Sequence, residues 1–116
     1  MQAEGRTMTL RKANTWGYLI IWEFRVHPRM KKRFLQAYGP GGEWAKLFSR
    51  DKHYIRTDLM QSSRLPGTYL TFDFWTSQEA YKDFRKAHAA EYKVIDENCK
   101  DLTETEREVG TYLRAG

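Results

Sequence analysis

Apolar and polar side chains alternate in three stretches of the chain, and each stretch predicts a β-strand. The first covers residues 18–27, where the even-numbered positions are apolar and the other face starts apolar and becomes charged. The second and third cover residues 53–62 and 68–75. The turn-rich sequence between these two predicts an antiparallel hairpin. A fourth strand is expected over residues 104–113.

Helical spacing of apolar residues takes over between the predicted strands. A first helix follows Pro28, and the glycine-rich run 39–42 separates it from a short second helix. The segment from Thr76 to Glu79 has the form of a capping box and begins a long third helix, with a bend expected near His88. The apolar residues that define the helical faces are Met30, Phe34, Ala37, Tyr38, Trp44, Leu47, Phe48, Tyr81, Phe84, Tyr92, Ile95, Cys99 and Leu102.

The predicted order is β-α-α-β-β-α-β, which is the split βαβ pattern of a ferredoxin-like α+β domain with a four-stranded antiparallel sheet. We expect an N-terminal arm over residues 1–17, the domain over residues 18–113 and a tail over residues 114–116. The helices can cover only one face of such a sheet. Burial of the other face against a second copy predicts a homodimer, paired through the sheet face as a dimeric α+β barrel.

Composition bounds the class of protein. The chain has 116 residues, of which 41% are hydrophobic and 15% aromatic, enough for one hydrophobic core and too few for two domains. Cys99 is the single cysteine, and no run of 18 apolar residues occurs, so we expect a cytoplasmic protein without a membrane span. The net charge of +5 is concentrated in the first half of the chain. It is compatible with an anionic ligand, with nucleic acid or with pairing of opposite halves in a dimer.

Four segments carry a family resemblance. The strand WEFRVHP, the segment YGPGGEWAKLF, the strand YLTFDFW and the following TSQEAYKDFRKAHAAEY resemble the antibiotic biosynthesis monooxygenase (ABM) family over residues 18–113. The resemblance implies a ligand cavity between sheet and helices, and a small aromatic ligand. It also implies oxygenase chemistry on electron-rich aromatic substrates with no cofactor and no metal. Haem-degrading members of the family use a first-strand Asn, which this chain lacks.

Three residues are the catalytic candidates. His88 lies on the inward helical stripe and is a candidate base for a phenolic proton, because the ordinary pKa of histidine is about 6.5. Trp75 matches the family's tryptophan at the end of the third strand and is a candidate wall that stacks on a planar ligand. Tyr38 is a candidate donor to a substrate carbonyl. The structural alternatives are a hydrogen-bonded core histidine and a tryptophan that plugs the sheet edge.

Seven further aromatic residues are expected to bind substrate, although an ordinary core explains them equally well. Two lie on each of the first and third strands, on the sheet face expected to meet the helices. The seven are Trp22, Phe24, Trp44, Phe72, Phe74, Tyr81 and Tyr92. The charged residues expected on the opposite face, as partners across a dimer interface, are Glu23, Arg25, Arg56, Asp58 and Asp73.

Two main functions remain open from the sequence. The first is a cofactor-independent monooxygenase that oxidises a planar aromatic or polyketide-like molecule with O₂. The second is a non-catalytic small-molecule-binding or stress-associated dimer, which the lack of a strong catalytic constellation favours. The sequence argues against RNA binding, because the glycine-rich RNP1 pattern is missing and Phe72 and Phe74 are expected beneath the helices.

Overall fold

The computed structural model describes residues 15–116, so all but the last three residues of the predicted arm lie outside the described part. The elements follow in the predicted order. They are β1 (Tyr18–Val26), the 3₁₀ turn η1 (Pro28–Met30), α2 (Lys31–Tyr38), α3 (Glu43–Phe48), β2 (Tyr54–Gln61), β3 (Thr68–Trp75), α4 (Gln78–Ala87), α5 (Ala89–Cys99), the 3₁₀ turn η2 (Lys100–Leu102) and β4 (Thr103–Leu113).

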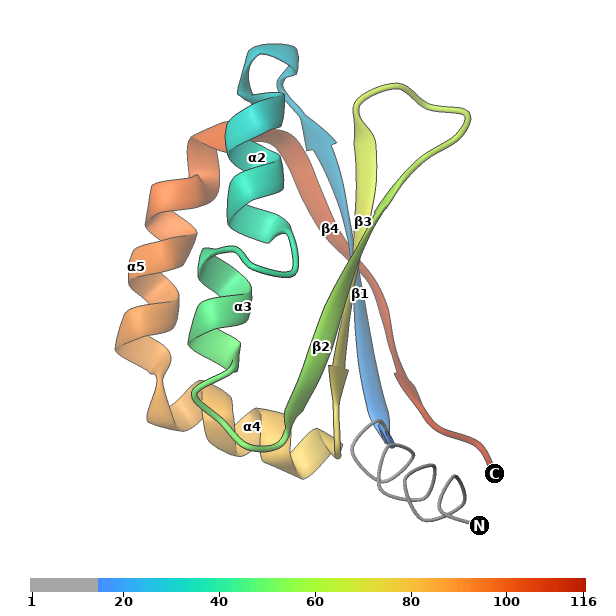
Figure 1. Ribbon diagram of the computed structural model, residues 1–116, viewed down its shortest axis with the longest axis vertical. Coiled ribbons are helices and arrows are strands. Elements are labelled where there is room, and N and C mark those ends of the chain that lie inside the picture. The colour runs from blue at the N-terminus through green and yellow to red at the C-terminus, as the bar shows by residue number, and fades with distance from the viewer. Residues whose placement is uncertain (1–14) are drawn as a thin grey trace, which may run out of the picture.

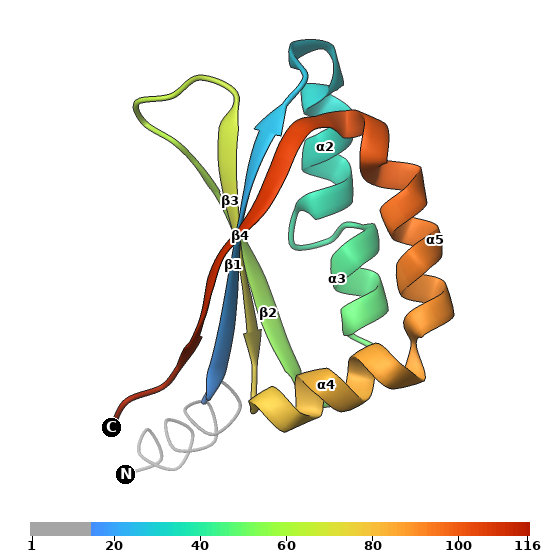
Figure 2. The same cartoon turned by 180° about the vertical axis from the view of Figure 1, so that it is seen from behind.

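The four strands form one antiparallel sheet in the order β2-β3-β1-β4, the ferredoxin-like arrangement expected from the split βαβ pattern. Figures 1 and 2 show that all the helices lie on one side of this sheet and leave the other side uncovered. α3 and α5 run beside one another over the lower half of the sheet, and α4 crosses below them (Figure 1). The predicted α+β fold is confirmed.

The long third helix begins and bends at specific residues. Its N-cap is Ser77, whose Oγ accepts a hydrogen bond from the Ala80 amide at 3.1 Å, so the predicted Thr76–Glu79 capping box is wrong by one residue. The bend expected near His88 is confirmed. α4 ends at Ala87, and His88 has non-helical dihedrals (φ −118°, ψ 30°) before α5 begins. This bend turns α5 back over the sheet.

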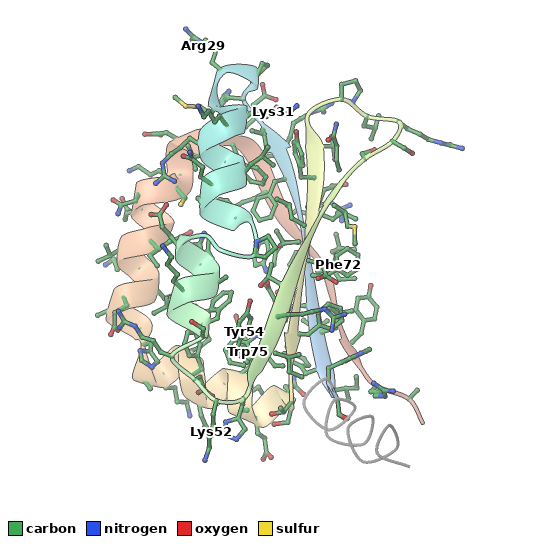
Figure 3. The ribbon with its side chains drawn as sticks, viewed as in Figure 1. Arg29, Lys31, Lys52, Tyr54, Phe72 and Trp75 are labelled. Atoms are coloured by element: carbon green, nitrogen blue, oxygen red, sulfur yellow. The ribbon has the colours of Figure 1, made fainter. Side chains whose placement is uncertain are left out.

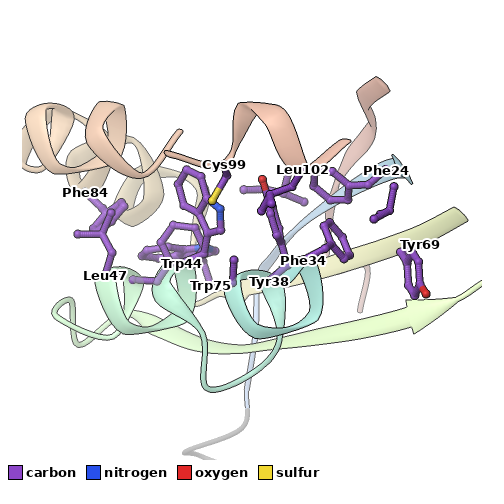
Figure 4. Close-up of a cluster of buried hydrophobic side chains, with 14 of the residues drawn as sticks. Phe24, Phe34, Tyr38, Trp44, Leu47, Tyr69, Trp75, Phe84, Cys99 and Leu102 are labelled. Carbon is purple, nitrogen blue, oxygen red and sulfur yellow. The ribbon is translucent and has the colours of Figure 1, made fainter. Parts of the chain in front are cut away.

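The hydrophobic core lies between the sheet and the helices and is mostly aromatic. Phe34, Trp75 and Phe84 have exposed fractions of 0%, 0% and 1%. Figure 4 shows rings from α2, α3 and α4 together with strand residues and Cys99 in this layer. Such ring-on-ring packing is directional as well as apolar, since offset and edge-to-face contacts are preferred.

The phase of β3 is opposite to the prediction. Tyr18 pairs with Trp75, Ile20 with Asp73, and Phe24 with Tyr69. Residues directly opposite each other in an antiparallel pair point to the same side, so the odd-numbered positions of β3 face the helices. Phe72 and Phe74 therefore lie on the other face, and the prediction that they meet the helices is wrong. Figure 3 shows Phe72 on the side of the sheet away from the helices and Trp75 on the helix side.

The error has a physical reason. Both faces of β3 are rich in rings, and the face with Leu70, Phe72 and Phe74 is the more apolar one. The helix-facing positions include Thr71 and Asp73, which line a cavity rather than filling a core. The prediction took the more apolar face of β3 as the face that meets the helices, and this choice was wrong.

The uncovered sheet face combines charge pairs with apolar side chains. Arg56 stacks on Phe74 at 4.1 Å from the ring centroid, and Arg107 Nε donates to Glu23 Oε1 at 3.1 Å. These charges have partners within the chain. Large apolar side chains remain exposed on or near this face, with exposed fractions of 47% for Met60, 38% for Val109 and 45% for Tyr112.

Residues before β1 also contribute to the fold. The ring of Trp16 packs edge-on against Phe74 at a centroid distance of 5.4 Å. The Gly17 amide donates to the Trp75 carbonyl at 2.9 Å, and the Arg114 amide donates to the Gly17 carbonyl at 3.0 Å. Within the described residues, no helix is long and apolar enough to cross a membrane.

Candidate functional site

A cavity of about 290 Å³ lies between the sheet and helices α2, α3 and α5. A space of this size is at the lower end of the range for small-molecule pockets, which are typically apolar with a few placed polar groups. Six aromatic rings and five polar side chains line it. They are Trp22 and Phe24 from β1, Tyr38 from α2, Trp44 and Phe48 from α3, Tyr92 and Asp96 from α5, Thr57 from β2, Thr71 and Asp73 from β3, and Glu106 from β4.

Five residues that the sequence predicted for the site line this cavity, namely Trp22, Phe24, Tyr38, Trp44 and Tyr92. Their rings contact one another. Phe24 lies 4.7 Å from Tyr38, and Trp44 meets Tyr92 edge-on at 4.8 Å, both measured between ring centroids. β1, α2, α3 and α5 thus form one continuous aromatic wall. Phe48 belongs to the same wall and was predicted only as a helix-face residue.

Trp75 lies deeper in the core and is not among the cavity-lining residues. It is fully buried and packs against Phe48, Tyr81 and Phe84 at centroid distances of 5.6, 5.2 and 5.0 Å. Tyr81 lines no cavity wall either, and its hydroxyl accepts a hydrogen bond from Arg85 at 3.1 Å. These contacts fit the structural alternative for both residues. Figure 4 shows Trp75 within the buried cluster.

His88 lies at the junction of α4 and α5, outside the cavity lining. Its Nδ1 is 3.5 Å from Glu91 Oε2, and its ring is 4.9 Å from the ring of Phe84. With 24% of its side chain exposed, it is at the edge of the core rather than pointing into the cavity. The two phenylalanines Phe72 and Phe74 are excluded from the cavity by the phase of β3 described above.

Asp73 is a cavity residue that the sequence prediction placed on the wrong face of the sheet, as it did its neighbour Thr71. The residue is 9% exposed, and its Oδ1 accepts a hydrogen bond from Thr57 Oγ1 at 2.7 Å. The Tyr54 hydroxyl lies 2.7 Å from the same Thr57 oxygen. Burial raises the pKa of Asp73 to about 6, and the hydrogen bond from Thr57 opposes that rise. A signal was present in the sequence, since an aspartate in the middle of a strand otherwise rich in rings is costly to bury without a role.

Two further carboxyl groups line the cavity at exposed positions and form its mouth. They are Asp96 on α5 and Glu106 on β4. Burial raises the pKa of Glu106, and the nearby negative charge of Asp96 raises it further. Within residues 15–116, none of Asp73, Asp96 and Glu106 forms a salt bridge. No Lys, Arg or His is among the described residues that line the cavity. The cavity is therefore acidic although the chain as a whole is basic.

Hydrogen-bond donors in the wall complete the site. Burial, and then the neighbouring Cys99, raise the pKa of Tyr38 well above its usual value, so its hydroxyl stays protonated. The indole Nε1 of Trp44 is buried and makes no hydrogen bond of standard geometry within residues 15–116, but the indole lies near the Tyr38 hydroxyl and the Cys99 thiol and lowers the pKa of both groups. The Tyr38 hydroxyl and the Trp44 N–H are thus neutral donors in the part of the cavity wall formed by α2 and α3. In the same part of the chain, no group of three His, Cys, Asp or Glu side chains is arranged to hold a metal ion.

Known proteins share this architecture. SnoaB, a cofactor-independent oxygenase from Streptomyces nogalater, is 15% identical over 88% of this chain and 96% of its own, with a TM-score of 0.64. A conserved protein from Methanosarcina mazei Go1 is 10% identical over 90% and 98%, with a TM-score of 0.66. Protein SO0527 from Shewanella oneidensis is 16% identical over 87% and 93%, with a TM-score of 0.62. At these identities the likeness shows the fold alone.

The fold and cavity define a ferredoxin-like α+β domain with an aromatic-walled cavity beneath its helices. The family model for antibiotic biosynthesis monooxygenase (ABM) matches residues 17–95, and the chain belongs to this family. The resemblance seen in the sequence is thereby confirmed. No curated protein sequence matches the chain.

Proposed function

We propose that the chain is a cofactor-independent monooxygenase that oxidises a small, planar, electron-rich aromatic molecule with O₂. The observation that carries the proposal is the pairing of an aromatic-walled cavity of about 290 Å³ with one buried carboxyl group, Asp73. Family membership supports the reaction class, and the neighbour SnoaB is itself described as a cofactor-independent oxygenase.

Asp73 takes the role of general base in this proposal, in place of His88. A carboxyl group with a pKa of about 6 is mostly ionised at pH 7 and still basic enough to accept a proton from a bound phenol or anthrone. The substrate anion then passes one electron to O₂, and the two radicals combine at carbon. The resulting peroxide loses water to leave a carbonyl. Overall, R₂CH₂ and O₂ give R₂C=O and H₂O, so no external reductant is consumed.

Neutral donors stabilise the anion that this step creates. The Tyr38 hydroxyl and the Trp44 indole N–H, together with the hydroxyls of Thr71 and Tyr92, are neutral groups in the wall that can donate to a substrate oxygen. Donors fixed by packing need no reorganisation when charge develops, which is the basis of electrostatic stabilisation in active sites. Trp22 and Tyr92 supply ring faces against which a planar substrate can stack.

The acidic lining restricts the substrate. Asp73, Asp96 and Glu106 disfavour a molecule that carries its own carboxylate, sulfonate or phosphate group. Ring faces and carboxylates together favour a neutral aromatic molecule or one with a positively charged nitrogen. The substrate class is therefore planar, electron-rich and neutral or cationic.

A homodimer through the uncovered sheet face is part of the proposal. Ile21, Leu70 and Phe72 remain partly exposed there, and Met60 and Tyr112 are exposed. Such a patch is typical of an interface between copies. Light scattering after size exclusion should give twice the chain mass of 13.8 kDa for the wild type and the single mass for Phe72→Glu. A wild-type mass of one chain would contradict the dimer.

One observation favours binding without chemistry as the second candidate. No cationic side chain lines the cavity within the described residues, so a substrate anion would depend on neutral donors alone. In that case the same cavity would bind the same class of molecule without turnover.

Oxygen uptake separates the two candidates. The metal-stripped protein is supplied with anthrones, naphthols and hydroquinones under ¹⁸O₂, and the wild type is compared with Asp73→Asn and with the exposed-carboxyl control Asp83→Asn. A monooxygenase gives uptake, one labelled oxygen in the product, and a loss of about 10²–10⁴-fold in Asp73→Asn only. Tight binding of the same compounds without uptake above background would favour the binding protein.

A further inference from the structure

Three oxygen atoms form a continuous hydrogen-bonded chain that starts at Asp73 in the cavity wall and ends at Tyr54, a residue of the edge strand. Asp73 Oδ1 and Thr57 Oγ1 are 2.7 Å apart, and Thr57 Oγ1 and Tyr54 Oη are also 2.7 Å apart. Asp73 lies on the inner strand β3, whereas Thr57 and Tyr54 lie on β2, the edge strand next to it. Both distances are typical of O–H···O hydrogen bonds.

The direction of this chain depends on the protonation of Asp73. An ionised carboxylate only accepts hydrogen bonds, so Thr57 must donate to it and the Tyr54 hydroxyl must donate to Thr57. Once Asp73 is protonated, it can donate to Thr57, and Thr57 can donate to Tyr54. Each hydroxyl can donate and accept, so the whole chain can reverse without any hydroxyl becoming charged.

Among the described residues, Asp73 has no second hydrogen-bonded path along which a proton could leave. Within residues 15–116, Thr57 is the one side chain with a hydrogen bond to its carboxyl group. Asp73 is only 9% exposed as a residue, and an aromatic molecule bound in the cavity would cover its cavity side. After it has taken a proton from substrate, Asp73 would therefore be closed off from water on the cavity side.

We propose that Thr57 and Tyr54 form a proton relay that returns Asp73 to its ionised form by passing the substrate's proton to the edge of the sheet. The inference rests on the proposed function, since it needs a base that is protonated in every turnover. In the relay the Asp73 proton moves to Thr57 Oγ1 as the Thr57 proton moves to Tyr54 Oη and the Tyr54 proton moves to water. One proton enters at Asp73 and one leaves at Tyr54.

Tyr54 is placed for the last step. It is partly exposed at the start of the edge strand, and its ring is held between Phe48 and Trp75 at centroid distances of 5.5 and 5.4 Å. Figure 3 shows Tyr54 beside Trp75 on the helix side of the sheet. Burial raises the pKa of Tyr54 to about 12, so the residue passes a proton on without resting as a phenolate.

Other ionisable groups surround Asp73 without a hydrogen bond to it. They add to its electrostatic environment but supply no continuous path. They are Tyr38 from α2, Tyr81 from α4, Tyr92 and Asp96 from α5, and Glu106 from β4.

The test separates a relay from a purely structural contact by comparing the first turnover with later ones. Tyr54→Phe keeps the ring and the Thr57–Asp73 bond but removes the outer hydroxyl. We expect its single-turnover rate to stay within about twofold of wild type, because Asp73 is already ionised. We expect its steady-state rate to fall at least fivefold. Equal slowing of both rates, or no slowing of either, overturns the relay.

Thr57 supplies an independent readout through the pH profile. Thr57→Val removes the donor to Asp73, so the acid limb of kcat/KM should move to higher pH and the steady-state rate should fall. Thr57→Ser should restore both, and the exposed control Thr76→Val should change neither. Circular dichroism and urea unfolding check that each variant is folded.

The outcomes distinguish this inference from the proposed function. Wild-type turnover together with unchanged kinetics in Tyr54→Phe overturns the relay and leaves the monooxygenase standing. An unshifted acid limb in Thr57→Val counts against the relay in the same way. Absence of wild-type turnover with every compound tested contradicts the proposed function and the relay with it.

Discussion

Replacement of Asp73 by asparagine should make the protein more stable at neutral pH. A buried charge raises the free energy of the folded state, and burial raises the pKa of Asp73 from 3.8 to about 6. That difference corresponds to about 3 kcal/mol. The asparagine keeps an oxygen that can accept the Thr57 hydrogen bond but carries no charge. Against a typical total stability of about 5–15 kcal/mol, this gain is large.

The sign follows from proton binding. Between pH 3.8 and about 6 the folded protein holds a proton on Asp73 and the unfolded chain does not, so this group makes the wild type less stable as pH rises. Above about pH 6 both states are ionised and the full cost is present. The stability gap between Asp73→Asn and wild type should thus be about 3 kcal/mol at pH 8 and shrink to about 1 kcal/mol at pH 4.5.

Urea unfolding followed by tryptophan fluorescence at the two pH values measures this gap directly. The exposed carboxyl control Asp83→Asn should stay within about 0.5 kcal/mol of wild type at both pH values. The reasoning is refuted if Asp73→Asn is no more stable than wild type at pH 8, or if its advantage is the same at pH 4.5. Combined with lost turnover, a stability gain would mark Asp73 as a residue kept for function at the expense of stability.

Three further outcomes follow from the same structure. Trp75→Ala should lower the free energy of unfolding in urea by about 3–5 kcal/mol, because the indole is fully buried. Trp22→Ala should lower it by only roughly 1–2 kcal/mol but abolish ligand binding, because Trp22 lines the cavity. N-methylquinolinium should quench tryptophan fluorescence at concentrations at least about tenfold lower than 2-naphthalenesulfonate, with the ratio falling at high salt; equal affinities would remove the argument from the acidic lining. Cys99 is 1% exposed and burial raises its pKa, so a thiol reagent should label it only after unfolding; rapid labelling of the native protein would contradict its buried position.

The order and extent of the elements were accessible from the sequence because each is fixed locally. Alternation located β1 and β3 to within a residue, and the glycine-rich run 39–42 ended α2 where the structure ends it. The helical pattern of residues 76–102 contains no Gly or Pro, and the bend was expected only from the start of a new turn near His88. These features depend on neighbours within a few positions in the chain.

The composition of the site was only partly accessible, because strand phase depends on pairing between distant residues. On β1 one face is plainly apolar, and Trp22 and Phe24 were placed correctly. On β3 both faces carry rings, and the choice of the more apolar face put Phe72 inside and Asp73 outside. In β2, a register shift between Tyr54 and Arg56 places Tyr54 on the helix side of the sheet. The alternation of residues in the sequence does not predict this shift.

The catalytic candidates show the same limit. His88 and Trp75 were chosen from residue type and family position, and neither lines the cavity: Trp75 is buried in the core, and His88 lies at the edge of the core between α4 and α5. Tyr38 was chosen for its position on the first helix and does line the cavity. A buried carboxyl next to a threonine hydroxyl on another strand can be recognised only once the sheet is assembled.

The most direct measurement of the central claim, that Asp73 is the base of an oxygenase cavity, is the pH dependence of oxygen uptake. With a saturable aromatic substrate, kcat/KM of the wild type should rise about tenfold between pH 5 and pH 8 along a limb centred near pH 6, where Asp73 ionises. Asp73→Asn should retain a rate lower by about 10²–10⁴-fold with no such limb. If kcat/KM of Asp73→Asn rises with pH along the same limb as the wild type and to the same height, the account is contradicted.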